Sequence, residues 1–431
     1  MAFTQFNTPA MLLCLAFAIV STSCQSLRQI GKISAPHAAF TSIVNKEHAT
    51  GQSAKSTLII SGFNPIPLFH DTIYQVPEIG QHLSNLHSVH VTEVTRGVTW
   101  PNEVRKVPDN VFHKSSFVVA AGGFLVPTKD HGSLTLFDLD FSPPVKHALT
   151  DNSADAKWFY HRVEWKDMNG DGLLDAVTCR AQKHIFGSAQ GQLVWFEHPK
   201  QNALSSTWNS HVIAANGPDS FFIVTSLPTP HGKVDCIITA GYFSTSLNVY
   251  WSTQTQGRWD DASKIEKRVI DNTIGNVFDV SVVDLNQDGT LDLLVTNNAL
   301  KDASLFAYTV PSDFRKDHFP RRTLATGFTS RTSGQGHGAP GSAVVVYPKS
   351  SHTASQKPLI LVSGDDDGQA YLIKPASNGV SDWSYQQSKF LDVGTGTVGG
   401  ISCADVDGDG YNEVFVPAYT EGAVHVFTFK P

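Results

Sequence analysis

Cysteine is scarce in this chain of 431 residues, which contains five. Cys14 lies in an apolar N-terminal run, and Cys24, Cys179, Cys236 and Cys403 remain downstream of it. The last three stand in apolar, strand-like runs, a setting that favours buried free thiols over a disulfide framework. No Asn-x-Ser/Thr sequence occurs, so N-glycosylation is not expected either.

Basic residues are too few to indicate a nucleic-acid partner. Lys and Arg number 32 against 39 Asp and Glu, which gives a formal net charge of −7. This balance provides no electrostatic footprint for nucleic acid or for an anionic membrane surface. The sequence also lacks a nucleophile motif, a phosphate-binding glycine loop and a dinucleotide fingerprint, so triad hydrolases, kinases and dehydrogenases are poorly supported.

Long hydrophobic runs are missing as well, and the one notable run spans residues 11–20. It is too short to cross a bilayer, and small residues follow it. We therefore expect a signal peptide over residues 1–23, a mature domain over residues 24–431, a secreted protein and no transmembrane segment. A lipoprotein anchor at Cys24 is the lesser alternative, because Ser21 stands where such signals carry a larger aliphatic residue.

What the chain does contain is one acidic pattern in three copies, at residues 167–175, 284–292 and 405–413. Each copy has oxygen-bearing side chains at positions 1, 3, 5 and 9 and Gly at position 6, and position 7 would add a backbone carbonyl. Ca²⁺ takes six to eight such oxygens in irregular geometry. The predicted ligands are Asp167, Asn169, Asp171, Leu173, Asp175, Asp284, Asn286, Asp288, Thr290, Asp292, Asp405, Asp407, Asp409, Tyr411 and Glu413.

Two alternatives compete with calcium loops of this kind. An EF-hand needs a Glu at position 12 and flanking helices, but Thr178, Val295 and Val416 occupy that position inside strand-like runs. The loops therefore join strands. The other alternative is three Asp-Gly turns without metal, and the recurrence of four oxygen positions in three copies favours calcium over it.

The loops belong to a longer repeat. Seven units, each with an apolar strand, a loop and a second strand, begin 54 to 67 residues apart along the chain. Each unit also holds a strand before the loop and a polar one at its end, with almost no helical periodicity. Four strands per unit at this period predict an all-β fold, a single-domain seven-bladed β-propeller. Residues 27–33 are expected to supply the outer strand of the last blade, beside residues 424–428.

The loop pattern, repeated before a strand, resembles that of the FG-GAP/VCBS-type propellers. These include the integrin α head, some secreted fungal lectins and some carbohydrate-converting enzymes. The resemblance covers nearly the whole mature chain, although its motif occurs only in units three, five and seven. It implies three structural Ca²⁺ ions. The Gly-Ala-Pro word at residues 338–340 precedes an inner strand, unlike in integrins, so an integrin-like ligand mode is not implied.

The resemblance implies two functions. The first is a lectin-like binding module for a glycan or an extracellular protein, with ligand contacts from loops such as residues 183–184 and 365–367. The alternative is a carbohydrate-active lyase or dehydratase at the channel mouth, with His161 or His337 as base, Tyr160 as acid and Arg162 neutralising enolate charge. The sequence predicts no oligomeric state.

His161 is the histidine with the clearest claim to such a role, because it is expected on an innermost strand between aromatic residues. Two plainer explanations stand beside it. The chain has 18 His, so several must fall on each face of a propeller by chance. His161 is equally compatible with a buried position bonded to a backbone carbonyl.

Overall fold

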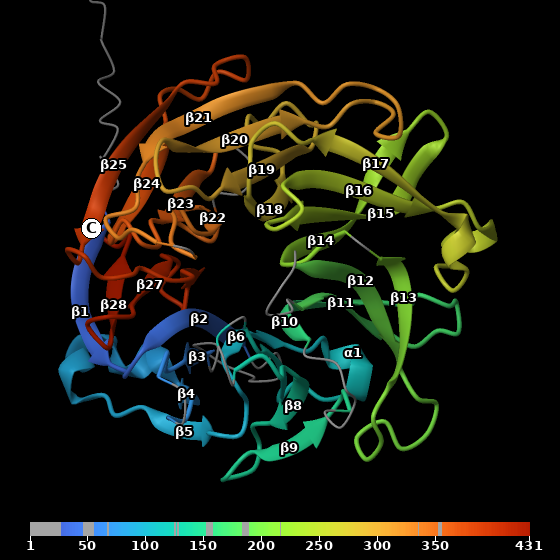
Figure 1. The fold of residues 1–431 in the computed structure, drawn as a ribbon. Helices are drawn as coiled ribbons and strands as arrows, with labels where there is room; N and C mark the ends of the chain where they lie inside the picture. The colour runs from blue at the N-terminus through green and yellow to red at the C-terminus, as the bar shows by residue number, and fades with distance from the viewer. Residues whose placement is uncertain are drawn as a thin grey trace, which may run out of the picture.

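The computed structural model describes residues 27–45, 56–66, 69–124, 126, 129–151, 158–182, 189–215, 217–334, 336–351 and 356–431. Seven four-stranded antiparallel sheets follow one another around a ring (Figure 1). The predicted seven-bladed β-propeller is thereby confirmed. The predicted signal peptide, Cys24 and residues 183–184 lie outside the described residues, so those predictions stay untested.

Each blade is built from four strands. Blade 1 contains β2 (Ala38–Asn45), β3 (Ser56–Gly62), β4 (Thr72–Val76) and β5 (Thr92–Thr95), and blade 2 contains β6 (Pro101–Lys106), β7 (Phe117–Gly122), β8 (Leu134–Asp138) and β9 (Val145–Ala148). Blade 3 contains β10 (Phe159–Lys166), β11 (Asp175–Gln182), β12 (Gln190–Glu197) and β13 (Asn209–Ala215). Blade 4 contains β14 (Phe221–Thr229), β15 (Gly232–Gly241), β16 (Ser246–Ser252) and β17 (Ile265–Asp271).

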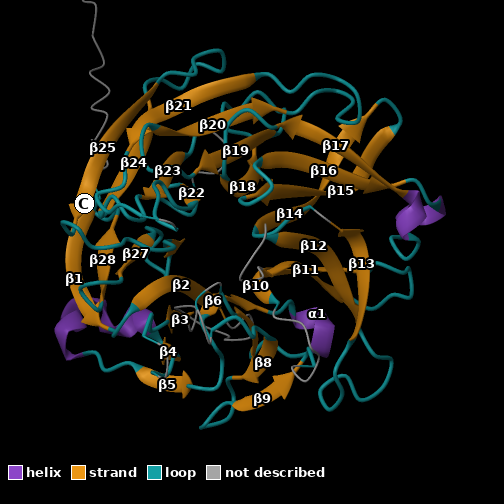
Figure 2. Cartoon of the chain, in the orientation of Figure 1, coloured by secondary structure: helices purple, strands orange, loops and turns teal. Residues whose placement is uncertain are grey.

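The remaining blades follow the same order. Blade 5 contains β18 (Val277–Val283), β19 (Asp292–Asn297), β20 (Ala303–Thr309) and β21 (Arg321–Phe328), and blade 6 contains β22 (Ala343–Val346), β23 (Leu359–Ser363), β24 (Gln369–Pro375) and β25 (Tyr385–Asp392). Blade 7 contains β26 (Ser402–Ala404), β27 (Glu413–Ala418), β28 (Ala423–Thr428) and β1 (Arg28–Ser34). In the described residues, helix is confined to short segments, namely η1 (Ile79–Ser88), α1 (Asp109–Phe112), η2 (Thr255–Gly257) and η3 (Ala262–Lys264) (Figure 2).

Burial explains why the middle strands are continuous apolar runs. Every residue of β3 and β27 is buried, whereas the outer strand β25 is mostly exposed. The middle strands are covered on both faces because side chains of one blade pack against those of the next. Ile238 and Val249 of blade 4, for example, share one apolar cluster with Val280 and Val295 of blade 5.

The ring closes through the N-terminal strand, as predicted. β1 pairs with β28 in antiparallel register from Arg28 opposite Thr428 to Ser34 opposite Ala423, and Figure 1 shows the blue strand beside the red one. The buried ring of His425 contributes, because its Nδ1 lies 2.9 Å from Gln29 Nε2. Closure covers two sheet edges that would otherwise be open for pairing with another chain.

Strand direction divides the connections between two faces. Because every blade is antiparallel, the loops joining first to second strands emerge on one face, which we call the acidic-loop face. The loops joining second to third strands and the crossings between blades emerge on the other, which we call the mouth face.

Cys179, Cys236 and Cys403 are free thiols, in line with the sequence-based expectation. In the described part of the chain, no helix has the length and apolar character to span a membrane.

Candidate metal loops and channel mouth

The three acidic loops have the same backbone bend. Gly172, Gly289 and Gly410, at position 6, have φ angles of 87°, 85° and 88°. A Cβ at any of them would meet nothing within 4 Å, so space does not require glycine there. The left-handed backbone does, because only glycine adopts it without strain.

The carboxylate at position 1 holds this bend in each loop. One oxygen of the Asp accepts a hydrogen bond from the N–H of the position 6 glycine. The distances are 2.9 Å for Asp167 and Gly172, 2.8 Å for Asp284 and Gly289, and 2.9 Å for Asp405 and Gly410. The three loops therefore share a conformation as well as a sequence pattern.

The acid at position 9 is buried in all three loops. Asp175, Asp292 and Glu413 are at most 1% exposed. Each accepts the N–H of the position 2 residue, at 2.8 Å, 3.0 Å and 3.2 Å respectively. Burial raises the pKa of each of these carboxyls to about 7. A bound cation would favour their charged forms.

Two observations test whether these residues fit Ca²⁺. Ligand atoms of Asp405, Asp407 and Glu413 all lie within 4.8 Å of one another. In the second loop, Asn286 is 3% exposed and its Oδ1 has no hydrogen-bond partner among the described residues. Its Nδ2 donates to Asp288 and to Val380 O, both at 2.8 Å. An all-oxygen donor set with an unpartnered oxygen at position 3 fits a hard cation such as Ca²⁺.

Each loop also contacts the next blade. The backbone N–H of Trp259 in blade 4 donates to Met168 O at 2.7 Å, and the backbone carbonyl of Val380 in blade 6 accepts from Asn286. A Cβ at Gly80 of η1 would lie 2.1 Å from Val406 O, so blade 1 packs closely on the third loop. The loops thus lie at the junctions of blades 3 and 4, 5 and 6, and 7 and 1.

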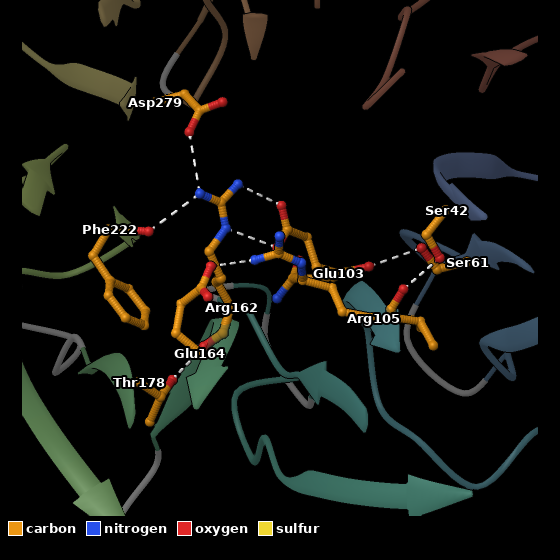
Figure 3. Close-up of polar contacts among 11 residues, drawn as sticks. Ser42, Ser61, Glu103, Arg105, Arg162, Glu164, Thr178, Phe222 and Asp279 are labelled. Carbon is orange, nitrogen blue, oxygen red and sulfur yellow. Dashed lines mark hydrogen bonds and ion pairs between the residues drawn. The ribbon is translucent and has the colours of Figure 1, made fainter. Parts of the chain in front are cut away.

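An ion network that is largely shielded from solvent joins the innermost strands of neighbouring blades and is centred on Arg162 of β10 (Figure 3). Its Nε and Nη2 donate to the two Glu103 oxygens at 2.8 and 2.7 Å. Its Nη1 lies 3.2 Å from Phe222 O and 3.5 Å from Asp279 Oδ1. Burial raises the pKa of a carboxyl, but here the guanidinium outweighs burial and holds the pKa of Glu103 below its usual value. One side chain therefore connects blades 2, 3, 4 and 5.

His161 precedes this arginine and is 8% exposed. Its ring packs against Phe124, Phe159 and Phe221. Its Nδ1 is buried without a hydrogen-bond partner in the described part of the chain. Burial lowers the pKa of His161 to about 4, which leaves the ring neutral at pH 7.

Tyr160 occupies a different environment from His161. Its side chain belongs to an apolar cluster that includes Val163 and Phe196, and it is 5% exposed. Burial raises the pKa of its hydroxyl. Arg180 beside this hydroxyl acts on its pKa in the opposite direction, so the surroundings of Tyr160 combine an apolar cluster with one cation.

His337 lies on the crossing between β21 and β22. Its Nδ1 is 2.9 Å from Asp366 Oδ2, and the buried Asp366 also accepts from Gly338 N at 3.2 Å and Thr397 Oγ at 2.9 Å. The sequence predicts Asp366 only as a ligand-contacting loop residue and misses its role as the partner of His337. The two residues are 29 positions apart, and no sequence spacing indicates the pair.

The polar groups around Asp366 extend towards blade 4. Asn298 Nδ2 donates to Asp365 Oδ2 at 3.2 Å, and the Tyr242 hydroxyl lies 3.5 Å from Asn298 Oδ1. Among the described residues, no hydrogen bond or ring contact joins His337 to His161. The four proposed catalytic residues therefore lie in different places. Arg162 belongs to the ion network, His161 packs among phenylalanine rings beside it, Tyr160 belongs to an apolar cluster, and His337 lies on the mouth face.

Comparisons with known proteins do not narrow the function of this chain. No protein-family model matches the chain, and no curated protein matches it. Among solved structures, a glucose dehydrogenase is 10% identical, with 78% of this chain and 97% of that chain covered and a TM-score of 0.42. An auxiliary nutrient binding protein from Bacteroides thetaiotaomicron is 9% identical, with coverage of 90% and 98% and a TM-score of 0.42. Similarity at this level does not indicate a shared function.

Proposed function

We propose that this protein is a secreted propeller that is stabilised by Ca²⁺ and binds a glycan or an extracellular protein. Three structural Ca²⁺ ions would be held by the loops at residues 167–175, 284–292 and 405–413. The observation that carries the proposal is the buried, unpartnered Oδ1 of Asn286 within one of three identically folded acidic loops. The proposed ligands are those at positions 1, 3, 5, 7 and 9 of each loop.

Calcium in these loops would stabilise the ring at three junctions between blades. Each loop joins two strands of its own blade and contacts the following blade. A cation shared by the position 1, 3, 5 and 9 side chains would fix both partners of each contact. A ligand that binds only the folded chain adds RT ln(1 + [L]/Kd), about 2.7 kcal/mol at a hundredfold excess over Kd.

The mouth face is the side on which we place ligand binding. Arg162 joins the innermost strands of blades 2, 3, 4 and 5 through charged and carbonyl partners, so we place the ligand on the loops around the mouth rather than among these paired groups. Those loops carry His337, whose side chain is 42% exposed, and Asp365, which accepts a hydrogen bond from the buried Asn298. Loops of this kind, held on a rigid sheet, commonly carry binding residues in propellers and other β folds.

A glycan array, read with and without Ca²⁺, tests the binding function. We expect selective retention of one glycan class and loss of retention after Asp365→Asn. A parallel array of extracellular proteins covers the second ligand class. Absence of any selective binder in both arrays, from a folded and calcium-loaded sample, would contradict the proposal.

Catalysis is the second candidate, because the neutral His161 has a buried nitrogen without a partner in the described part of the chain. In a lyase or dehydratase, His161 or His337 would take the proton next to a carbonyl, and Arg162 would offset the developing charge. Arg162 already binds Glu103 through two donors, so it would act as a member of that pair. A polysaccharide panel monitored for unsaturated-sugar absorbance tests this. Turnover that is lost in His161→Ala with folding intact would favour catalysis over binding.

A further inference from the structure

The loop at residues 167–175 differs from the other two in its surroundings. Asn169 and Asp171, at positions 3 and 5, border a surface hollow of about 340 Å³. A second hollow of about 310 Å³ adjoins it, and both are lined by Glu197 and Lys200. Both are open depressions of the surface rather than enclosed cavities.

The same positions in the other loops are engaged by protein groups. In the second loop, Asn286 is 3% exposed and donates to Val380 O of the next blade. In the third loop, Lys430 Nζ lies 2.7 Å from Asp409 Oδ2, at position 5. In the first loop, Lys200 stands beside Asp171 at the longer distance of 3.7 Å and is 76% exposed, so this cation is free to move towards a ligand.

Blade 3 also carries an acidic residue that its counterparts lack. The third strands of blades 5 and 7 end at Thr309 and Thr428, and the Thr428 hydroxyl donates to the position 9 acid, Glu413, at 2.8 Å. The third strand of blade 3 ends at Glu197 instead. Its Oε1 accepts from Asn169 Nδ2 at 3.3 Å and its Oε2 lies 3.0 Å from His211 Nε2. Glu197 therefore connects the loop to the lining of the hollow.

The lining is polar and includes an unpartnered group. His198 is 8% exposed, and neither of its ring nitrogens has a hydrogen-bond partner among the described residues. The rings of His211 and Trp195 stack with their centroids 4.1 Å apart, and both residues line the hollow. A lining with charges, imidazoles and hydroxyls disfavours an apolar ligand and suits one with many hydroxyl groups.

The number of oxygens that the loop offers to Ca²⁺ indicates which chemical group of a ligand would bind the ion. The loop offers oxygens at five positions, whereas Ca²⁺ takes six to eight. The remaining positions are filled by water or by ligand oxygens, and a carboxylate is the hardest oxygen donor a saccharide carries. Lys200, which lines the hollow, favours the same charge, whereas Arg258 in the lining is already paired with Asp260.

We propose that the calcium ion of residues 167–175 binds the carboxylate of an acidic saccharide, a uronate. Lys200 would neutralise the bound carboxylate, while Glu197 and His211 hydrogen-bond the sugar hydroxyls. This inference rests on the proposed calcium site and adds a second ligand site, on the face opposite the mouth.

The test is calorimetric titration of trigalacturonate into the calcium-saturated protein. We expect Lys200→Glu to weaken binding roughly tenfold or more, since it replaces an attractive charge by a repulsive one. Lys430→Glu is the matched control, because it makes the same change beside the third loop and should leave trigalacturonate binding unchanged. Asp171→Ala should abolish binding, and Asp288→Ala, at the second loop, should retain it.

Three further arms separate the explanations. Methyl-esterified trigalacturonate should not bind, because its carboxylates are blocked. Binding of a polyglutamate peptide with the same dependence on Lys200 would assign the site to acidic peptides and overturn the saccharide. Wild-type protein that binds three Ca²⁺ but no trigalacturonate would overturn this inference alone. A wild-type protein that binds no Ca²⁺ would overturn the proposed function.

Discussion

The two faces of the ring assemble their candidate sites in different ways. On the acidic-loop face, each site comes from nine consecutive residues whose backbone is bent by its own first carboxylate. On the mouth face, His337, Asp366 and Thr397 come from three separate connections around blade 6. A local site needs only its own loop to be correctly folded. A site of the second kind needs the whole ring to be closed.

Deleting residues 25–35 should produce the largest effect and break both faces at once. This change removes β1 and leaves β28 with an open, apolar edge, so we expect aggregation rather than a trimmed monomer. Size-exclusion chromatography and thermal melting measure the outcome. A soluble variant with a cooperative transition would show that closure does not depend on this strand.

Glu103→Gln should produce the next largest effect and acts on the ion network alone. It leaves the largely shielded Arg162 without its bidentate partner, and breaking a buried ion pair costs about 3–5 kcal/mol. The matched control is Glu93→Gln, whose pair with Arg96 is exposed and should contribute under about 1 kcal/mol. Denaturant unfolding measures both. Equal losses in the two variants would show that the network is no more stabilising than a surface pair.

Asp288→Ala tests whether the acidic loops act locally. We expect it to remove one of three calcium sites, with about 2–3 kcal/mol lost at a hundredfold excess of Ca²⁺ over Kd. Amide exchange should rise at residues 376–385, which contact this loop through Val380, and not at residues 258–264. Asp171→Ala should show the reverse pattern, because Trp259 contacts the first loop. Exchange that rises evenly around the ring would contradict junction-specific stabilisation.

His161→Phe should have the smallest effect at pH 7 and a growing one in acid. Because burial lowers the pKa of His161 from 6.5 to about 4, its neutral form contributes stability that is complete above pH 6.5 and is lost as the pH falls towards 4. The Phe variant lacks this loss. Its stability relative to wild type should rise by up to about 3 kcal/mol between pH 6.5 and 4. A difference that does not change with pH would mean that His161 is solvated.

The sequence was sufficient for the features that depend on local patterns. The repeat period predicted the seven blades, and the outer-strand pattern of residues 27–33 predicted β1 and its pairing beside residues 424–428. The acidic loops were located to the residue because their Asp and Gly positions recur at fixed spacing within a short segment. The role of glycine at position 6 was predicted as well, because the sharp bend of the loop needs a backbone conformation that glycine adopts without strain.

The features that were missed depend on contacts between blades. Nothing near Arg162 in the sequence indicates Glu103 or Asp279, which lie 59 and 117 residues away. The same holds for Asp366 as the partner of His337. Tyr160 and His161 are neighbours in sequence, yet their side chains enter different environments because successive residues of a strand point to opposite sides. Sequence adjacency therefore suggested a joint role that the packing does not favour.

The most direct test of the account is the calcium content and thermal stability of the purified chain. We predict three Ca²⁺ per chain by calorimetric titration, a lower melting temperature after treatment with EDTA, and full recovery when Ca²⁺ is added back. Mg²⁺ should not substitute, because it demands a smaller, octahedral site. A melting curve that EDTA leaves unchanged, together with no measurable binding of Ca²⁺, would contradict the account.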